Sequence, residues 1–479
     1  MGRAREGEGH KYRAWGHPHP YPLPARGRET CRLDPGAEQA ITWERDHPSQ
    51  SAGEIAPQLL LPPLAGEGQG GGAAKDSELT RMSTRHFNPE ATGPLTNIRV
   101  LDLSRLMAGN MLSLQLADFG ADVIKIEPPV GDPLRDWKDD GHSLFWKTYG
   151  RNKRSVVLNL RDQPAMDALW ALIDTADVFI ENYRPGTLEQ MGLSPEKLHA
   201  RNPNLIIVRI SGFGQTGPYA HLPGFGTIVE GMSGFAYRTG FPDREPVLPP
   251  LALADMIAGI YGSSATLTAL FARERGLSKG QVIDLSLLEP MFSVLGPEAA
   301  IFQTTGKIKE RVGSASNTAS PRNVYKCRDG KYLALSGSTP QVARRIFEII
   351  GRSDMNADPR FATNSDRVKN RPLVDAAIGA WFAEHDHDEA LKIMREAGAT
   401  VGPIYNIADA VADEHFVERE IIVDVEDAQF GALPMHNIVP RLSETPGTWR
   451  RPAPSLGEHT AEVLAEVGID AQTLQTESA

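Results

Sequence analysis

The 479-residue chain contains only two cysteines, Cys31 and Cys327, and neither has the neighbours of a zinc site. Two cysteines cannot form a disulfide framework, so we expect a reducing compartment, the cytoplasm, and no metal site. No uninterrupted apolar run approaches the ~18 residues that a membrane-spanning helix needs, which argues against a membrane partner. The formal charge is −11, so the chain lacks the basic excess of proteins that bind nucleic acids.

The composition is that of a globular protein, with 41% hydrophobic and 23% charged residues. A single hydrophobic core stops growing near ~250 to 300 residues, so a chain of this length predicts two or more domains. Any anionic ligand must be bound by a local cluster of Lys and Arg.

Residues 1–90 have no sustained helical or strand periodicity, and they include the Gly-rich run 66–72. Such a segment cannot bury enough apolar surface to fold, so we predict a disordered or mis-translated N-terminal extension. Parts of it resemble translated bacterial intergenic repeat sequence, and we expect translation to begin at Met82. The alternative is a disordered arm that binds a partner. Mass spectrometry of the native N-terminus distinguishes the two.

Residues 91–304 are predicted to form the first part of a large α/β domain. Strands are expected at 98–103, 122–127, 155–160, 178–181, 205–211 and 280–286, and helices at 108–119, 164–175 and 256–275. Strand and helix alternate in the pattern of right-handed βαβ units, which predicts a parallel sheet.

The chain changes character after residue 304. We predict a smaller inserted α+β domain over 305–400, with a hairpin turning at Asp329-Gly330 and helices starting at Gln341 and Arg371. Residues 401–479 are expected to return to the large domain.

Asp255 stands between an apolar approach, residues 249–254, and the long helix predicted for 256–275. Its position is that of an N-cap, where a carboxylate accepts hydrogen bonds from free helix N–H groups. The helix dipole would hold that carboxylate ionised. An N-cap Asp is common, so the position alone is weak evidence for a catalytic role.

Two motifs point to other chemistry and are set aside. Gly212, Gly214 and Gly217 match the dinucleotide pattern G-x-G-x-x-G, but Pro218 and Pro223 leave little room for the required helix, so we interpret these glycines as a close backbone approach. The tract 384–388 contains two His at i and i+2, which do not share a helix face, and it predicts a solvated helix start. The sequence has no G-x-S-x-G elbow for a serine hydrolase.

Five basic residues lie in or beside loops at the strand ends of the predicted sheet, where α/β proteins bind ligands. They are Arg135, Arg151, Lys153, Arg154 and Arg184. A ligand with several phosphates would suit such a set, whereas any one of them alone is more simply a surface charge.

These features together resemble the class III CoA-transferases, the CaiB/BaiF family, over about residues 97–468. The segments that carry the resemblance are Val100-Leu101-Asp102-Leu103, Ala108-Gly109, residues 120–127, Gly131-Asp132-Pro133-Leu134-Arg135, Asn152-Lys153-Arg154-Ser155, Glu181-Asn182-Tyr183-Arg184-Pro185-Gly186, residues 212–218, Ala254-Asp255, Gly280-Gln281, Asp329-Gly330 and residues 456–460.

The resemblance implies a Rossmann-like large domain built from both ends of the chain, a smaller domain between, and an interlocked homodimer. Asp255 matches the family's nucleophile, which attacks an acyl-CoA to give an aspartyl anhydride and then an aspartyl-CoA thioester. CoA is thus a substrate, no cofactor is held permanently, and a free carboxylic acid is the acceptor.

By the same resemblance, a CoA site is expected from Asn152, Lys153, Arg154, Asn182, Tyr183 and Arg184, and we add Arg135. Backbone N–H groups near Ala108 and Gly109 are expected to stabilise the oxyanion.

Four positions depart from the family pattern: Met107 replaces a Gln of the formyl-CoA branch, Gly226 and Glu230 replace an acidic residue and a Gln of many members, and Asn110 replaces the usual Pro. The Gly-rich lid of the formyl and oxalate enzymes is also missing from 310–330. Formate and oxalate are therefore disfavoured, while formyl-CoA or succinyl-CoA type enzymes remain the nearest description. An α-methylacyl-CoA racemase of the same fold would need a His base where this chain has Phe225 and Gly226. A non-catalytic CoA-binding protein, with Asp255 only a cap, is the remaining alternative.

Overall fold

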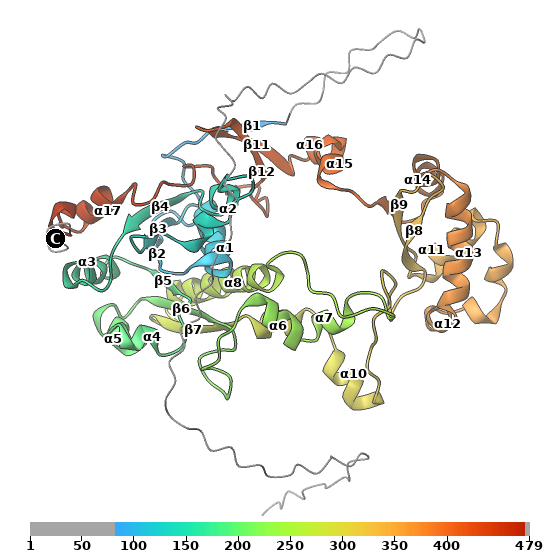
Figure 1. Cartoon of the computed structure of the whole chain (residues 1–479), viewed down its shortest axis with the longest axis horizontal. Helices are drawn as coiled ribbons and strands as arrows, with labels where there is room; N and C mark the ends of the chain where they lie inside the picture. Colours follow the sequence, from blue (N-terminus) through green and yellow to red (C-terminus); the bar gives the residue numbers. More distant parts are fainter. Residues whose placement is uncertain (1–81, 475–479) are drawn as a thin grey trace, which may run out of the picture. The chain divides into compact units, whose positions relative to one another are not determined.

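The computed structural model describes residues 82–474 (Figure 1). Its largest sheet has six parallel strands in the order β4-β3-β2-β5-β6-β7. They are β2 (Arg99–Asp102), β3 (Asp122–Glu127), β4 (Lys153–Val157), β5 (Val178–Glu181), β6 (Ile206–Ser211) and β7 (Gln281–Ser286). The mixed α/β class with a large parallel sheet is confirmed. All six predicted strands exist, and they differ from the prediction only at their ends.

This strand order reverses between β2 and β5. The chain runs outward from β2 to β4 and then returns to continue from β5 on the other side, as in doubly wound nucleotide-binding folds. Loops that leave the carboxyl ends of two such strands diverge, and they open a crevice between them. The sheet therefore marks the end of β2 and β5 as the place for a ligand.

One face of the sheet is covered by α1 (Leu106–Asp118) and α8 (Leu253–Glu274), which pack together in Figure 1. Val100, Val123 and Val208 point to this face and belong to the same buried cluster as residues of both helices. Strand residues alternate between the two faces, so a face can be assigned from its cluster.

The opposite face carries Leu101 and Ile124 and is covered by α3 (Gln163–Ile173), α5 (Pro195–Arg201) and α17 (Thr460–Glu466). Helix α17 lies near the end of the described chain, so a segment distant in sequence helps to cover this face of the sheet. Because both faces are buried, the strands consist of nearly continuous apolar runs, which is why they could be predicted.

Small residues let α1 and α8 approach each other closely. A Cβ on Gly259 of α8 would lie 2.8 Å from the carbonyl oxygen of Ala108, and one on Gly262 would lie 2.4 Å from Leu112 Cδ1. Both distances are shorter than contacts that real Cβ atoms make. The backbone of α8 at these glycines thus packs directly on α1, and this contact holds the start of α8 beside the start of α1.

A second sheet joins β1 (Thr84–Arg85) in parallel to β11 (Ile422–Asp427), which pairs antiparallel with β12 (Gly431–His436). The ring centroids of Phe87 and Trp449 lie 6.3 Å apart beneath it. The N-terminal extension predicted for 1–90 is therefore wrong for residues 84–87, because backbone pairing and aromatic packing order them. Residues 1–81, and with them the prediction that translation begins at Met82, lie outside the described part.

A third sheet has the order β10-β9-β8 and is antiparallel. Its strands β8 (Arg322–Lys326) and β9 (Tyr332–Ser336) form the predicted hairpin, in which Gly330 adopts φ +87°. With β10 (Val401–Pro403), α11 (Pro340–Ile349), α13 (Arg371–Glu384) and α14 (His387–Glu396) they enclose a separate buried cluster. This part has the predicted α+β character, while the domain boundaries at 305 and 400 stay predictions.

The remaining elements are short connections and helices. They are η1 (Pro133–Asp136), α2 (Leu144–Tyr149), α4 (Thr187–Gln190), α6 (Gly226–Met232), α7 (Phe235–Arg238), α9 (Leu288–Ser293), α10 (Glu298–Thr305), α11 (Pro340–Ile349), η2 (Ser353–Asn356), η3 (Pro359–Phe361), α12 (Asn364–Lys369), α13 (Arg371–Glu384), α14 (His387–Glu396), α15 (Ile407–Ala412), α16 (Glu414–Glu418) and η4 (Ala471–Leu474). Within residues 82–474, no helix has both the length and the apolar character needed to span a bilayer.

Candidate active site

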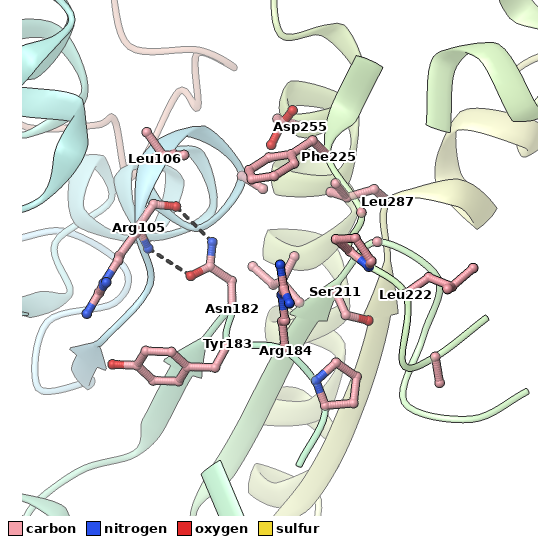
Figure 2. Close-up of a pocket in the computed structure, with 17 residues that line it drawn as sticks. Arg105, Leu106, Asn182, Tyr183, Arg184, Ser211, Leu222, Phe225, Asp255 and Leu287 are labelled. Carbon is pink, nitrogen blue, oxygen red and sulfur yellow. Dashed lines mark hydrogen bonds between the residues drawn. The ribbon is translucent and has the colours of Figure 1, made fainter. Parts of the chain in front are cut away.

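A pocket of about 150 Å³ lies in the crevice where the strand order reverses (Figure 2). Its walls are the loop after β2 (Arg105, Leu106), the loop after β5 (Asn182 to Arg184), the end of β6 and the start of α8 with Asp255. The structure thus brings Ala108, Asn182, Tyr183, Arg184 and Asp255 of the predicted site residues to one place.

Asp255 is the third residue of α8 and not its N-cap, which corrects the prediction. The helix already begins at Leu253, and Ala252 occupies the cap position without a side-chain hydrogen bond. The acceptor at this helix start is Glu230 of α6, whose Oε1 receives the backbone N–H of Ala254 at 3.1 Å. Residues 249–254 were interpreted as an approach segment, whereas Leu253 and Ala254 already belong to the first turn of the helix.

The pKa of Asp255 lies above its usual range. Burial, and then the charge of the nearby Glu230 carboxylate, raise this pKa to about 6 against a smaller opposite effect of the Asp255 backbone N–H. The prediction that the helix start holds Asp255 ionised is therefore wrong in direction, because desolvation outweighs the helix terminus. At pH 7 the carboxylate still predominates by roughly ten to one.

Gly226 lies against the Asp255 carboxylate. A Cβ at position 226 would come within 2.3 Å of Asp255 Oδ2. Glu230 follows Gly226 by four residues on α6, so both face the start of α8. Gly226 leaves room for the carboxylate, and Glu230, which is 2% exposed, caps the helix that carries it. These contacts give two of the unexplained sequence positions a structural role.

Asn182 ties the two loops of the crevice together. Its Oδ1 accepts the backbone N–H of Arg105 at 2.9 Å and its Nδ2 donates to the Arg105 carbonyl at 2.8 Å, as the dashed lines in Figure 2 mark. The Arg105 guanidinium lies 5.7 Å from the centre of the Tyr183 ring. Arg184 is exposed, and its side chain has no hydrogen-bonding or ionic partner within residues 82–474. It is thus free to bind an anion at the mouth of the pocket.

A buried network of hydrogen bonds and an ion pair around Asp132 fixes the start of α1. Leu106 has a left-handed φ of +60°, and its backbone N–H donates to Asp132 Oδ1 at 3.0 Å. Asp132 Oδ2 also accepts from Asn110 Nδ2 at 2.8 Å and lies 3.0 Å from Lys125 Nζ. Burial alone would raise the pKa of Asp132, but Lys125 and the backbone donors lower it overall, so Asp132 is a carboxylate.

Five predicted site residues do not line this pocket, and the four of them with polar side chains use these to bind other parts of the chain. Arg135 donates from Nε and Nη2 to the Glu127 carboxylate at 2.7 Å and stacks on Trp146. Arg154 pairs with Asp122, Glu462 and Glu466. Asn152 donates to Asp118 at 2.8 Å. Lys153 is fully buried and donates to Asn110 Oδ1 at 2.9 Å, and burial lowers its pKa to about 7.

Gly109, the fifth of these predicted residues, and Arg151 also have internal roles. Arg151 binds the Asp118 carboxylate at 2.7 Å. Gly109 packs on Ser104, where a Cβ would lie 1.9 Å from Oγ. Gly212 supports the interpretation of a close backbone approach, since its Cβ would lie 2.6 Å from the Gly224 Cα. CoA contacts for the residues outside the pocket stay predictions.

Comparison with known proteins gives one consistent result. The chain is 38% identical over 378 residues to the succinyl-CoA–D-citramalate CoA-transferase of Chloroflexus aurantiacus, covering 78% of this chain and 94% of that protein. It is 37% identical over 389 residues to the succinate–glutarate CoA-transferase of Agrobacterium fabrum, covering 79% and 97%.

A solved structure agrees with the sequence relatives. The crystal structure of a CaiB/BaiF family protein from Brucella suis has a TM-score of 0.69 and 34% identity, and the match covers 79% of this chain and all of that one. The family model described as CoA-transferase family III matches residues 95–460, which include the crevice, Asp255 and the segments that first indicated the resemblance. The chain therefore belongs to CoA-transferase family III.

Proposed function

We propose that this protein transfers CoA from an acyl-CoA thioester to a free carboxylic acid, with Asp255 as the nucleophile. The observation that carries the proposal is a half-buried carboxylate in the crevice at the carboxyl ends of the strands, with Gly226 leaving its Oδ2 unobstructed. A desolvated carboxylate is a stronger nucleophile than a hydrated one, and its pKa of about 6 leaves it ionised at neutral pH.

The first half of the reaction moves CoA onto the enzyme. A carboxylate oxygen of Asp255 attacks the thioester carbonyl, the C–S bond breaks, and an aspartyl-acyl anhydride and the CoA thiolate form. The thiolate then attacks the aspartyl carbonyl of the anhydride, which releases the donor acid as its carboxylate and leaves an aspartyl-CoA thioester. No proton or electron is gained or lost.

The second half runs the same bonds in reverse. The acceptor carboxylate attacks the aspartyl-CoA carbonyl and expels the thiolate, which gives a new anhydride. The thiolate then attacks the acceptor's carbonyl, so that the new acyl-CoA leaves and the Asp255 carboxylate is restored. We assign oxyanion stabilisation to backbone N–H groups at the start of α1 near Ala108, which is supported by the absence of a side-chain cap on that helix.

The size of the pocket supports a division of the CoA molecule. A volume of about 150 Å³ suits only the reacting end of an acyl-CoA, since pockets for drug-sized ligands measure ~300 to 1,000 Å³. The nucleotide end must therefore lie outside, and the exposed guanidinium groups of Arg105 and Arg184 at the mouth favour its phosphates. Binding energy from this remote end can press the thioester onto Asp255.

The relatives favour short dicarboxylic acids as substrates. Those from Chloroflexus aurantiacus and Agrobacterium fabrum are named for succinyl-CoA with D-citramalate and for succinate with glutarate. We propose that succinyl-CoA, or another ω-carboxyacyl-CoA, is the donor here. The homodimer is likewise proposed from the family, and sedimentation of the purified protein at several concentrations tests it.

Mass spectrometry tests the proposal most directly. Succinyl-CoA alone should leave a CoA adduct on the peptide that contains Asp255, and addition of an acid such as glutarate should discharge it as glutaryl-CoA. The variant Asp255→Asn should bind CoA but form neither adduct nor product. Full turnover of Asp255→Asn would overturn the mechanism, and acid-independent scrambling of a chiral α-methylacyl-CoA would favour a racemase. If the native protein binds CoA but catalyses no transfer, the result would favour a non-catalytic CoA-binding protein.

A further inference from the structure

A second cavity, of about 1110 Å³, adjoins the first one. Met107 and Met256 line it, and these are the chain neighbours of Ala108 and Asp255, which line the first pocket. The starts of α1 and α8 therefore form the wall between the two cavities. Methionine side chains have three rotatable bonds, so this wall can yield to a ligand more readily than one of branched residues.

The inner walls of the second cavity are apolar. Besides the two methionines they include Met111, Trp137, Phe145 and Tyr149. The rings of Trp137 and Phe145 meet edge to face at 5.5 Å, and both are more than one third exposed to the open cavity. Such a surface favours the hydrocarbon part of a ligand, and Met107 gives it no hydrogen-bond donor.

Two arginines, Arg419 and Arg441, line the same cavity. Arg441 donates from Nη2 to the carbonyl oxygens of Arg419 and Glu420, so its guanidinium is held in place while its Nε and Nη1 stay unused by residues 82–474. The Arg419 side chain has no partner within the same residues. Both side chains are exposed and can bind an anion without breaking an existing ion pair.

The other titratable groups of this cavity leave its positive charge uncompensated. Glu420 is the one carboxylate among the described lining residues, and it accepts from Ser83 Oγ and pairs with Arg85. Burial, and then the charge of Arg151, lower the pKa of His436, so that His436 is neutral at pH 7. Although the whole chain has a formal charge of −11, this cavity has two arginines without an ion pair within residues 82–474, so it can attract an anionic ligand.

We propose that the second cavity receives the acceptor acid, and that Arg419 and Arg441 bind the carboxylate that does not react. The proposal rests on the proposed CoA-transferase function and names its substrate class: a saturated dicarboxylic acid of glutarate length or longer. The apolar walls contact the methylene chain, and the reacting carboxylate points past Met107 and Met256 toward Asp255. A monocarboxylic acid of equal length leaves both arginines unpaired, which sets the selectivity.

Steady-state kinetics with matched acids tests this assignment. Succinyl-CoA is held at saturation, and the acceptors are glutarate and suberate beside pentanoate and octanoate. We expect Arg441→Gln to raise the KM for both dicarboxylates about tenfold, because a charge-assisted ion pair is lost. With the two monocarboxylates, which cannot form this pair, the variant should keep the kcat and the KM of the native protein. Arg419→Gln should act in the same direction. Arg344→Gln is the matched control, since Arg344 is an exposed arginine of α11 outside the cavity.

Calorimetric titration with glutarate separates the two levels of the proposal. Binding to the native protein that weakens in Arg441→Gln but not in Arg344→Gln supports the arginine site even without turnover. If the native protein transfers no CoA to any acid, the proposed function fails while the site can stand. Transfer with equal losses for dicarboxylates and monocarboxylates, or no loss at all, in Arg441→Gln would overturn the arginine site alone.

Discussion

The carboxylate of Asp255 and the α-carbon of Gly226 lie so close that a Cβ at position 226 would stand 2.3 Å from Oδ2. Position 226 is therefore part of the space that the nucleophile occupies.

Gly226→Ala should reduce turnover by about 100-fold, because the added methyl group displaces the carboxylate and a misplacement of ~1 Å has that effect. The KM for the acyl-CoA should change little, since the pocket mouth is untouched. Initial rates with succinyl-CoA and glutarate measure both. Gly231→Ala is the control on the same helix, because a Cβ there meets nothing within 4 Å. Native turnover in Gly226→Ala would contradict the assigned contact.

The acid limb of the kcat/KM profile should have an apparent pKa of about 6, because Asp255 must be ionised to attack. Glu230→Gln should move this limb to lower pH. The variant removes the charge that adds to the shift, while its amide oxygen can still accept the Ala254 N–H. Rates from pH 4.5 to 8 decide the point, and a limb that stays in place would show that Glu230 does not act on Asp255.

Asp255→Asn should increase the stability of the inactive protein at pH 7. The pKa of Asp255 is 3.8 in the unfolded chain and about 6 in the folded protein, so the folded protein favours the neutral carboxyl group. The resulting stabilisation is complete below pH 3.8 and is lost as the pH rises through about 6. An amide cannot ionise, so the variant should gain about 1 to 3 kcal/mol at pH 7 and less than ~1 kcal/mol at pH 4. Thermal unfolding at the two pH values measures the difference, and an equal shift at both would point to packing instead.

Asp132→Ala should destabilise the protein by about 3 to 5 kcal/mol, because it removes one of the two carboxylates paired with the buried Lys125, the other being Asp102, and frees the Leu106 N–H. The start of α1 would lose its fixed conformation, so turnover should fall as well. Calorimetric unfolding gives the first effect. Asp136→Ala serves for comparison, since Asp136 is 81% exposed and 3.9 Å from Lys138, and it should change stability by less than ~0.5 kcal/mol.

Much of the fold could be predicted because parallel strands buried on both faces are apolar runs between turn residues. Strands β3 and β5 have the predicted bounds. The start of α8 was missed because Leu253 and Ala254 are as apolar in a helical turn as in an extended approach. The signal for the true cap was Glu230, 24 residues before Ala254, and only the packing of α6 on α8 brings Glu230 to the helix start.

The site could be predicted only in part. The family resemblance named Asp255, Asn182, Tyr183 and Arg184 as site residues, and the structure places them around one pocket. Arg154 was expected with them, but it binds Glu466, which lies more than 300 residues away in the sequence. A sequence does not reveal which cations are already neutralised by such distant carboxylates. Arg154 is buried against three of them, whereas Arg184 is exposed and has none within residues 82–474.

The contact between Glu420 and the first described strand also affects Arg441 in the second cavity. Glu420 has φ +51°, an unfavourable conformation for its residue type, and Ser83 and Arg85 anchor its side chain while its carbonyl oxygen orients Arg441. A shortened protein beginning after Asn88 would keep every lining residue of both cavities but lose this anchor. If Arg441 binds the acceptor acid as proposed, we expect such a shortened protein to lose its preference for dicarboxylic acids, although the removed residues line neither cavity.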